Sequence, residues 1–265
     1  MANRLLHVEN LNIEFHDHLL PETVVYDFDL DMNEGEIVGL VGESGSGKSM
    51  SALAIAGLLS RHDMQKRGEI VFADTDILNC PRKELRALQG NSLSMIFQEP
   101  MTSLDPLKKI GWQVEETMRI HTDKSKEERK KRALEVLSHV GLENPERVYN
   151  SYPHQLSGGM RQRVMIASAM AITPKLLIAD EPTTALDVTV QSQIVDLLKH
   201  INAKHNTAIL FISHDLSLVK TLCKRVLVMQ NGYVVESGDS ETIFNNPEKE
   251  YTKQLITSIP KVELQ

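Results

Sequence analysis

Residues 42–49 read Gly-Glu-Ser-Gly-Ser-Gly-Lys-Ser, a glycine-rich run that ends in a lysine and a serine. The run fits the pattern G-x-x-x-x-G-K-[ST] of phosphate-binding loops. Glycines let successive backbone N–H groups converge on phosphate oxygens, and a following helix adds the positive end of its dipole. The lysine would reach the β- and γ-phosphates, and the serine hydroxyl would be a ligand of Mg²⁺. The sequence therefore predicts a phosphate site at Gly42, Ser44, Gly45, Ser46, Gly47, Lys48, Ser49 and Met50.

Two adjacent acids, Asp180 and Glu181, end an apolar run that starts at residue 175. Asp180 at such a strand end is placed to hold Mg²⁺ through water, as phosphoryl-transfer enzymes of this type require. Glu181 is the natural general base for an attacking water. Adjacent acids at a strand end are often helix caps, but the glycine-rich loop upstream favours the catalytic interpretation.

Two further polar residues follow apolar runs. Gln98 follows the run at residues 93–96, and His214 follows the run at residues 208–212. The carboxyl ends of parallel strands meet at the edge of the sheet where ligands bind. We therefore expect Gln98 to touch Mg²⁺ or water and His214 to contact the γ-phosphate, although a glutamine at a strand end is usually just solvated.

Ser157, Gly158 and Gly159 precede a small, apolar helical segment and form a second candidate anion site. A serine cap and bare backbone N–H groups at a helix start attract anions. An ordinary helix cap explains the same residues, and one chain has no obvious use for both sites on a single nucleotide.

Alternating apolar and polar residues predict strands at 5–8, 11–15 and 24–30, which would form an antiparallel layer before the loop. Apolar runs predict a strand at 36–41 and a helix at 50–59 on either side of the loop.

Aromatic rings in the antiparallel layer are candidates for stacking on adenine. They are Phe15 and Tyr26, with His16 as a weaker candidate. Packing within the sheet explains both aromatic residues at least as well.

Helical spacing of apolar residues begins at residue 110 and continues to about residue 143. The charged run at 124–132 is mixed in sign, which predicts a solvated helix face and not a nucleic-acid patch. Another helix is expected at 164–172, and one more at 190–200.

The composition is that of an ordinary globular protein. The 265 residues are 41% hydrophobic and 25% charged, and the net charge is −7, which does not indicate nucleic-acid or anionic-lipid binding. We find no secretory signal and no apolar run long enough to span a membrane. The 2 cysteines, Cys80 and Cys223, lie far apart, which predicts reduced structural thiols in a cytoplasmic protein. The histidines show no paired metal-ligand spacing.

The motifs, taken in order, resemble those of an ABC-transporter ATPase. The resemblance equates residues 42–49 with the Walker A motif, Gln98 with the Q-loop, and residues 156–160 with the signature motif. Residues 176–180 with Glu181 resemble the Walker B motif, residues 185–187 the D-loop, and His214 the switch histidine. The match covers nearly the whole chain, and it implies ATP and Mg²⁺ as ligands.

The resemblance also implies a fold. This is an α/β P-loop NTPase (RecA-like) core with an antiparallel β layer and a helical signature subdomain. We expect a single ABC ATPase domain over residues 1–265. Within it, residues 1–100 and 175–240 would form the core and β layer, 101–174 the helical subdomain and 241–265 a C-terminal tail.

Finer features resemble one branch, the D-type ATPase of dipeptide, oligopeptide and nickel importers. They are residues 42–49, 97–106 and 156–163 and the tail at 251–260. Longer members continue into a cysteine-bearing extension, whereas this sequence stops at Gln265, so no iron–sulfur cluster is expected. The family's adenine-stacking aromatic is expected near residues 21–23, which read Pro-Glu-Thr.

The resemblance implies a mechanism and partners. Family ATPases pair head to tail, so Ser157, Gly158 and Gly159 would bind the γ-phosphate of the ATP that a partner holds. ATP-driven closure would move the helical subdomain around Gln98 and push on the permeases, and hydrolysis through Glu181, Mg²⁺ and His214 would reopen the pair. We expect a second, distinct ATPase subunit, two permease subunits and an extracytoplasmic solute-binding protein. The chain would be peripheral, at the cytoplasmic face of the cell membrane.

Three alternatives remain open at this point. Peptide is the first choice of solute, and nickel or a metal chelate is the second. A non-transport ABC ATPase is less favoured, because the interval from Lys48 to Ser157 is too short for a long coiled-coil insertion and only one Walker A motif occurs. A catalytically dead interaction protein is disfavoured, since the lysine, both acids and His214 are all present.

Overall fold

The computed structural model describes residues 3–16, 21–59, 63–98, 103–184 and 186–258. The chain divides into two compact units. The first comprises Met1–Pro81 and Ala208–Gln265, and the second comprises Arg82–Thr207. The predicted α/β fold class is confirmed, because the structure combines helices with antiparallel and parallel sheets.

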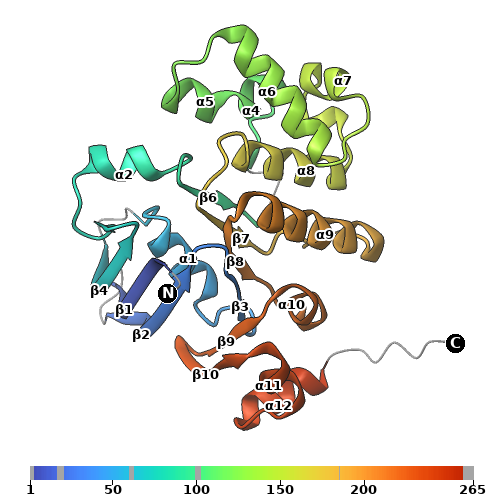
Figure 1. Cartoon of the computed structure of the whole chain (residues 1–265). Helices are drawn as coiled ribbons and strands as arrows, with labels where there is room; N and C mark the ends of the chain where they lie inside the picture. The colour runs from blue at the N-terminus through green and yellow to red at the C-terminus, as the bar shows by residue number, and fades with distance from the viewer. Residues whose placement is uncertain (1–2, 17–20, 60–62, 99–102, 185, 259–265) are drawn as a thin grey trace, which may run out of the picture. The chain divides into compact units, whose positions relative to one another are not determined.

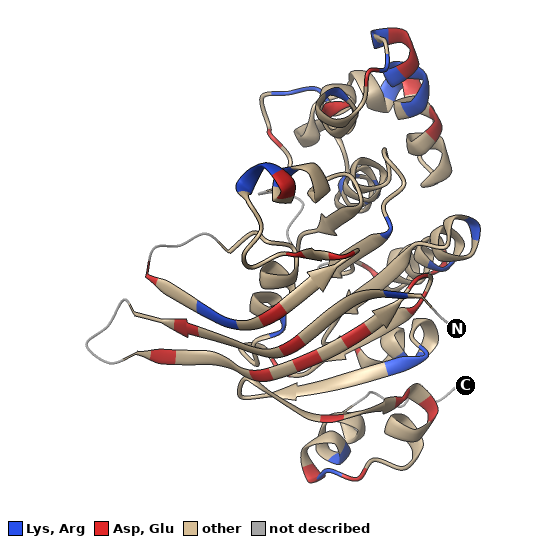
Figure 2. Ribbon diagram, turned by 60° about the vertical axis from the view of Figure 1, so that its left-hand side comes forward, with Lys and Arg blue, Asp and Glu red and all other residues tan. Residues whose placement is uncertain are grey.

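An antiparallel sheet of four strands opens the first unit. Its order is β2(Glu22–Asn33), β1(Arg4–Phe15), β4(Met64–Phe72) and β5(Thr75–Asp76), as Figure 1 shows for the first three. Along β2, Phe28, Leu30 and Met32 are buried whereas the acids between them are exposed. Figure 2 shows acidic segments recurring along these strands. The period of two predicted from the sequence therefore separates an apolar face from an acidic one.

The two strands predicted at 5–8 and 11–15 are one strand, so the prediction of a break was wrong. Asn10 adopts a left-handed conformation with φ of 50°, and the pairing register shifts between Val8 and Leu11. Asparagine tolerates this conformation better than most residues. The result is a bulge inside β1, because residues on both sides of it continue to pair with β2 and β4.

A second sheet region of the first unit contains β3(Ile37–Val41), β8(Ala208–Ile212), β9(Arg225–Gln230) and β10(Tyr233–Asp239). β3 pairs in parallel with both β8 and β9, and β10 pairs antiparallel with β9. All five residues of β8 are buried, as expected for a parallel strand covered on both faces.

The helices of the first unit are α1(Lys48–Ile55), α10(Leu216–Leu222), α11(Ser240–Asn245) and α12(Glu250–Thr257). α1 starts and ends earlier than the predicted 50–59. Burial raises the pKa of the Cys223 thiol, and neither Cys223 nor Cys80 forms a disulfide, which fits the predicted structural thiols.

The second unit pairs β6(Leu93–Ile96) in parallel with β7(Leu176–Asp180). Its helices are α2(Arg82–Leu88), α4(Ile110–Val114), α5(Glu116–His121), α6(Lys126–His139), α7(Pro145–Asn150), α8(Gly158–Ala169) and α9(Val188–His205), with a 3-10 turn at Pro153–Gln155. The helical stretch predicted from 110 to 143 is thus three helices. A capping box between Ser125 and Glu128 starts α6. In the described part of the chain, no helix combines the length and apolar character needed to cross a bilayer.

Candidate active site

The glycine-rich loop joins β3 to α1, which is the strand–loop–helix context that the sequence predicts. Gly42 has φ of 149°, and a Cβ atom there would overlap the backbone oxygen of Met229. Gly47 has φ of 103°, and a Cβ atom there would lie 2.9 Å from the backbone oxygen of Val24. The loop therefore needs glycine at both positions, for conformation and for space.

The Lys48 side chain turns back into this loop. Its Nζ atom donates hydrogen bonds to the carbonyl oxygens of Gly42 and Glu43, both at 2.8 Å, and lies 3.4 Å from the Ser46 hydroxyl oxygen. Only 6% of the residue is exposed. A buried ammonium group needs such partners, because losing its hydration without them is costly. The loop thus holds a cation at the position predicted for phosphate binding.

His214 leaves the first unit's sheet at the same edge as the loop. Leu40 of β3 pairs with Ile212 of β8, and the two strands are parallel, so the residues that follow them emerge side by side. His214 is exposed, and the next residue, Asp215, caps α10 by accepting a hydrogen bond from the Ser217 N–H at 2.9 Å. The predicted placement of the histidine at this edge is confirmed within this unit.

In the second unit, Gln98 follows β6, Asp180 is the last residue of the parallel strand β7, and Glu181 comes directly after it. Ile96 of β6 pairs with Ala179 of β7, so all three residues lie at one sheet edge. Asp180 is 4% exposed and Glu181 is 6% exposed, whereas Gln98 is exposed. Two buried carboxylates beside a solvated amide form an oxygen-rich edge of the kind that phosphoryl-transfer chemistry uses.

Glu181 has an unusual backbone. Its φ is 49°, in the left-handed region that costs a residue with a side chain roughly 1–2 kcal/mol. The Thr184 hydroxyl donates to its carboxylate at 3.2 Å, and the Thr184 N–H donates to its carbonyl oxygen at 3.2 Å. Strain at a buried acid supports a functional role. This conformation was not predictable from the residue types, because a residue before proline normally prefers an extended backbone.

The second candidate anion site is a capped helix start. Ser157 precedes α8 and accepts a hydrogen bond from the Met160 N–H at 3.3 Å, while Gly158 and Gly159 lie in the first turn. Arg161 fixes the segment that leads into the helix by donating a hydrogen bond to the Leu156 carbonyl oxygen at 2.8 Å. The predicted serine cap is confirmed. The helix therefore begins at Gly158 and not at residue 164, where the sequence predicts its start. The proposed contact with a partner's ATP stays a prediction.

The candidate adenine-stacking rings have other neighbours. Tyr26 stacks on Tyr233 with ring centroids 4.4 Å apart, Phe15 is half-buried at the end of β1, and His16 pairs with Glu14 at 3.4 Å. One face of Tyr26 on β2 therefore packs against β10 of the second sheet region, and a role of these rings in adenine binding stays a prediction.

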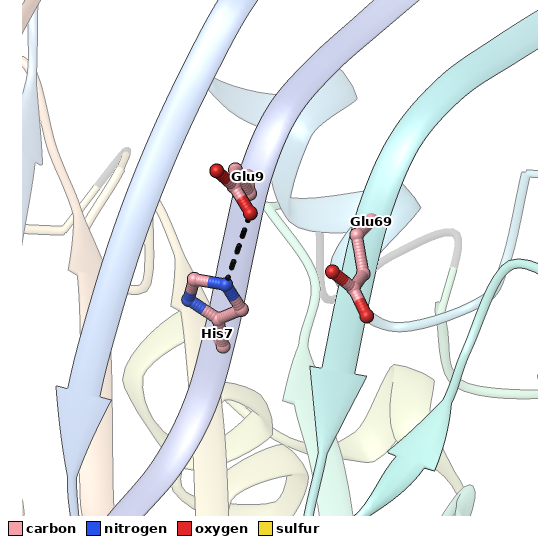
Figure 3. A group of neighbouring side chains, drawn as sticks. All are labelled: His7, Glu9 and Glu69. Carbon is pink, nitrogen blue, oxygen red and sulfur yellow. Dashed lines mark ion pairs between the residues drawn. The ribbon is translucent and has the colours of Figure 1, made fainter.

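A cluster that sequence spacing did not reveal lies on the acidic sheet. His7 and Glu9 of β1 and Glu69 of β4 are close enough to offer ligand atoms to one metal ion (Figure 3). Cross-strand pairing of Glu9 with Glu69 creates the cluster, which no single stretch of sequence encodes. Both ring nitrogens of His7 already have partners: Nδ1 lies 2.7 Å from the Asp31 carboxylate and Nε2 lies 3.5 Å from that of Glu9. We interpret the cluster as a surface ion-pair network.

Comparison with known protein families identifies the class. The family model described as "ABC transporter" matches residues 25–184, which include the loop, the capped helix start and both buried acids. The chain belongs to this family, whose ATP-binding subunits hydrolyse ATP.

Individual relatives are consistent with that class. The chain is 46% identical over 257 residues to the dipeptide transport ATP-binding protein DppD of Escherichia coli, covering 97% of this chain and 79% of the relative. It is 46% identical over 263 residues to the oligopeptide transport ATP-binding protein OppD of Bacillus subtilis, covering 99% and 74%. Among solved structures, it resembles a dimeric ATP-binding cassette in a post-hydrolysis state with ADP and Pi, with a TM-score of 0.81, 30% identity and coverage of 89% and 99%.

Some predicted features lie outside the described residues. They are residues 99–102 after Gln98, Ala185 of the D-loop, and the end of the tail from residue 259. Asp187, the last D-loop residue, caps α9 by accepting a hydrogen bond from the Val190 N–H at 2.9 Å. The helix predicted at 190–200 is therefore present, but it begins at Val188 and ends at His205.

Proposed function

We propose that this chain is the ATP-hydrolysing subunit of an importer of dipeptides or oligopeptides. The observation that carries the proposal is the loop at residues 42–49, which joins a buried strand to a helix and encloses the Lys48 ammonium group. Identity of 46% to DppD over 97% of the chain supports peptide as the solute.

The loop and the start of α1 bind the phosphates of ATP. Backbone N–H groups from Gly42 to Met50 face phosphate oxygens, and Lys48 exchanges the carbonyl oxygens of Gly42 and Glu43 for the β- and γ-phosphates. This exchange keeps the ammonium group paired in both states, so binding does not expose an unpaired buried charge.

The proposed ligands of Mg²⁺ are the Ser49 hydroxyl, the Gln98 amide oxygen and the Asp180 carboxylate. Hard oxygen donors of this kind suit Mg²⁺, which also keeps several waters. When bound with ATP, Mg²⁺ neutralises charge on the phosphate oxygens.

Hydrolysis uses Glu181 as the general base. The carboxylate accepts a proton from a water whose oxygen attacks the γ-phosphorus, while the bond from that phosphorus to the β-phosphate oxygen breaks, giving ADP and phosphate. His214 contacts the γ-phosphate. The fixed backbone of Glu181, with φ of 49°, limits the positions that its carboxylate can take.

The complete importer requires other chains. Ser157, Gly158 and Gly159 bind the γ-phosphate of ATP held by a second ATPase subunit, which explains the second anion site. Two permease subunits and a solute-binding protein complete the complex, with this chain peripheral at the cytoplasmic face of the membrane. The names of DppD and OppD as transport ATP-binding proteins support this arrangement.

Uptake by the assembled complex tests the proposal. Vesicles that contain the complex should accumulate a labelled di- or oligopeptide in an ATP-dependent manner, and Lys48→Ala should abolish uptake. Lys224→Ala, at an exposed lysine of the same unit, is the matched control and should retain uptake. Accumulation of nickel and no peptide would overturn the peptide assignment, whereas full uptake with Lys48→Ala would overturn the role of the loop.

A further inference from the structure

We propose that Tyr251 of α12 is a positioning residue for the phosphate-binding loop, so that nucleotide affinity depends on the C-terminal helix. The inference rests on the proposed function of residues 42–49. Tyr251 is the first residue of the tail that resembles the importer branch, but the sequence assigns it no role, and it lies 208 residues from the loop residue that it contacts.

A hydrogen bond joins α12 to the loop. The backbone N–H of Glu43 donates to the Tyr251 hydroxyl oxygen at 3.1 Å. Burial raises the pKa of Tyr251, so its hydroxyl stays neutral. The bond lies at an exposed position, so the hydroxyl of a distant element takes the place that water would otherwise occupy on this N–H.

Glu43 is also the residue whose carbonyl oxygen accepts a hydrogen bond from Lys48 at 2.8 Å. Tyr251 therefore fixes the N–H side of Glu43 while Lys48 occupies its carbonyl side. On the other side of the loop, the Gly232 N–H donates to the Ser46 carbonyl oxygen at 3.0 Å. Contacts that hold a binding loop in shape before the ligand arrives increase affinity, because less ordering remains to be done on binding.

The start of α12 is itself fixed to the sheet. The carboxylate of Glu236, on β10, accepts hydrogen bonds from the N–H groups of Glu248 at 2.8 Å and Lys249 at 3.2 Å, immediately before the helix begins at Glu250. An acid that binds free N–H groups at a helix N-terminus stabilises the helix. A continuous set of contacts thus runs from β10 through α12 to the loop.

The test removes only the hydroxyl group. Tyr251→Phe in the full-length chain should raise the Kd for ATP and for ADP by roughly 2- to 10-fold, the effect of one hydrogen bond. In the assembled complex, KM for ATP should rise by the same factor while kcat at saturating ATP stays unchanged. Hydrogen exchange at the Glu43 amide should accelerate. Glu236→Gln should change affinity in the same direction by a smaller factor.

Tyr233→Phe is the matched control, because it removes a hydroxyl from the same unit and keeps the ring that stacks on Tyr26. It should leave the Kd unchanged. Lys48→Ala distinguishes the proposed role of the loop from that of Tyr251: if nucleotide binding survives that change, the proposed role of the loop is wrong. If Lys48→Ala abolishes binding and Tyr251→Phe leaves the Kd unchanged, or lowers kcat and thermal stability without changing the Kd, the positioning role is wrong.

Discussion

Two buried charged residues give the clearest chemical signals at the scale of single residues. Lys48 turns its ammonium group onto carbonyl oxygens of its own loop, and Glu181 keeps a left-handed backbone beside proline. Neither arrangement serves packing, since each places a costly group in the interior. Both arrangements are expected if Lys48 binds phosphate groups and Glu181 is positioned to act as a general base on a water molecule.

The role of Glu181 predicts a specific kinetic defect. Glu181→Gln should lower kcat of the assembled complex by roughly 10²–10⁴-fold, because the amide cannot accept the proton of the attacking water. ATP should still bind, since the loop is unchanged. The measurement is steady-state ATP hydrolysis with a parallel binding titration. Glu146→Gln, at an exposed acid of the same unit, is the control, and near-normal turnover with Glu181→Gln would contradict the assignment.

Residue spacing in the sequence identified the motif residues, but it did not identify the residues that keep those motifs in position. The glycine-rich loop, the adjacent acids and the serine cap are local patterns, and each was recognisable within a few positions. The tail that contains Tyr251 was also recognised, but the role of this tyrosine was not, because its contact with Glu43 depends on how distant parts of the chain fold together. The pair of Glu9 and Glu69 was not predicted either, because it also forms only when two strands distant in sequence lie side by side.

For the secondary-structure elements, the type of each segment, strand or helix, was predictable, but the residues at which the segments begin and end were not. Alternation identified β1, but the left-handed Asn10 bends the strand without ending it. Apolar spacing identified α8 from residue 164, whereas the Ser157 cap starts the helix at Gly158. Caps and bulges depend on hydrogen bonds and backbone angles, which hydrophobic periodicity does not report.

Close packing in the second unit predicts a stability effect at Gly111 of α4. A Cβ atom there would overlap the ring of Tyr149, which cannot move freely because its hydroxyl donates to Glu115. Burial, together with that bond, raises the pKa of Tyr149 to about 12. Gly111→Ala should therefore lower the free energy of unfolding by about 1–3 kcal/mol, measured by urea denaturation.

Gly158→Ala is the comparison for this prediction. The nearest atom to a Cβ there, in Leu186, is 3.9 Å away, so the free energy of unfolding should not fall. Equal stability of Gly111→Ala and the unchanged chain would show that the Tyr149 ring gives way easily.

The start of α12 predicts a dependence of stability on pH. Although burial alone would raise it, hydrogen bonds from Glu248 and Lys249 help hold the pKa of Glu236 below its usual value. The stabilisation is therefore present above the unfolded pKa of about 4.3 and is lost as the pH falls through the lower folded value. Glu236→Gln should be less stable than the unchanged chain at pH 7, and the difference should shrink below about pH 4. Thermal unfolding at a series of pH values measures this, and a difference independent of pH would contradict it.

At the scale of the whole molecule, the α/β class and the family were correctly predicted. The motifs of the family occur in a fixed order over nearly the full chain, so both could be predicted without knowledge of the tertiary structure. The limits of the helical subdomain, expected at 101–174, stay a prediction. Each compact unit presents its predicted residues at one sheet edge, the loop with His214 in the first and Gln98 with the two acids in the second.

Isolation of the tagged chain from its native membranes, under conditions that preserve complexes, shows whether the chain works as part of an importer. We expect to recover it with a second ATPase subunit, two permease subunits and a solute-binding protein that carries a peptide. Recovery only with ribosomes or DNA, or alone in the soluble fraction, would contradict an importer.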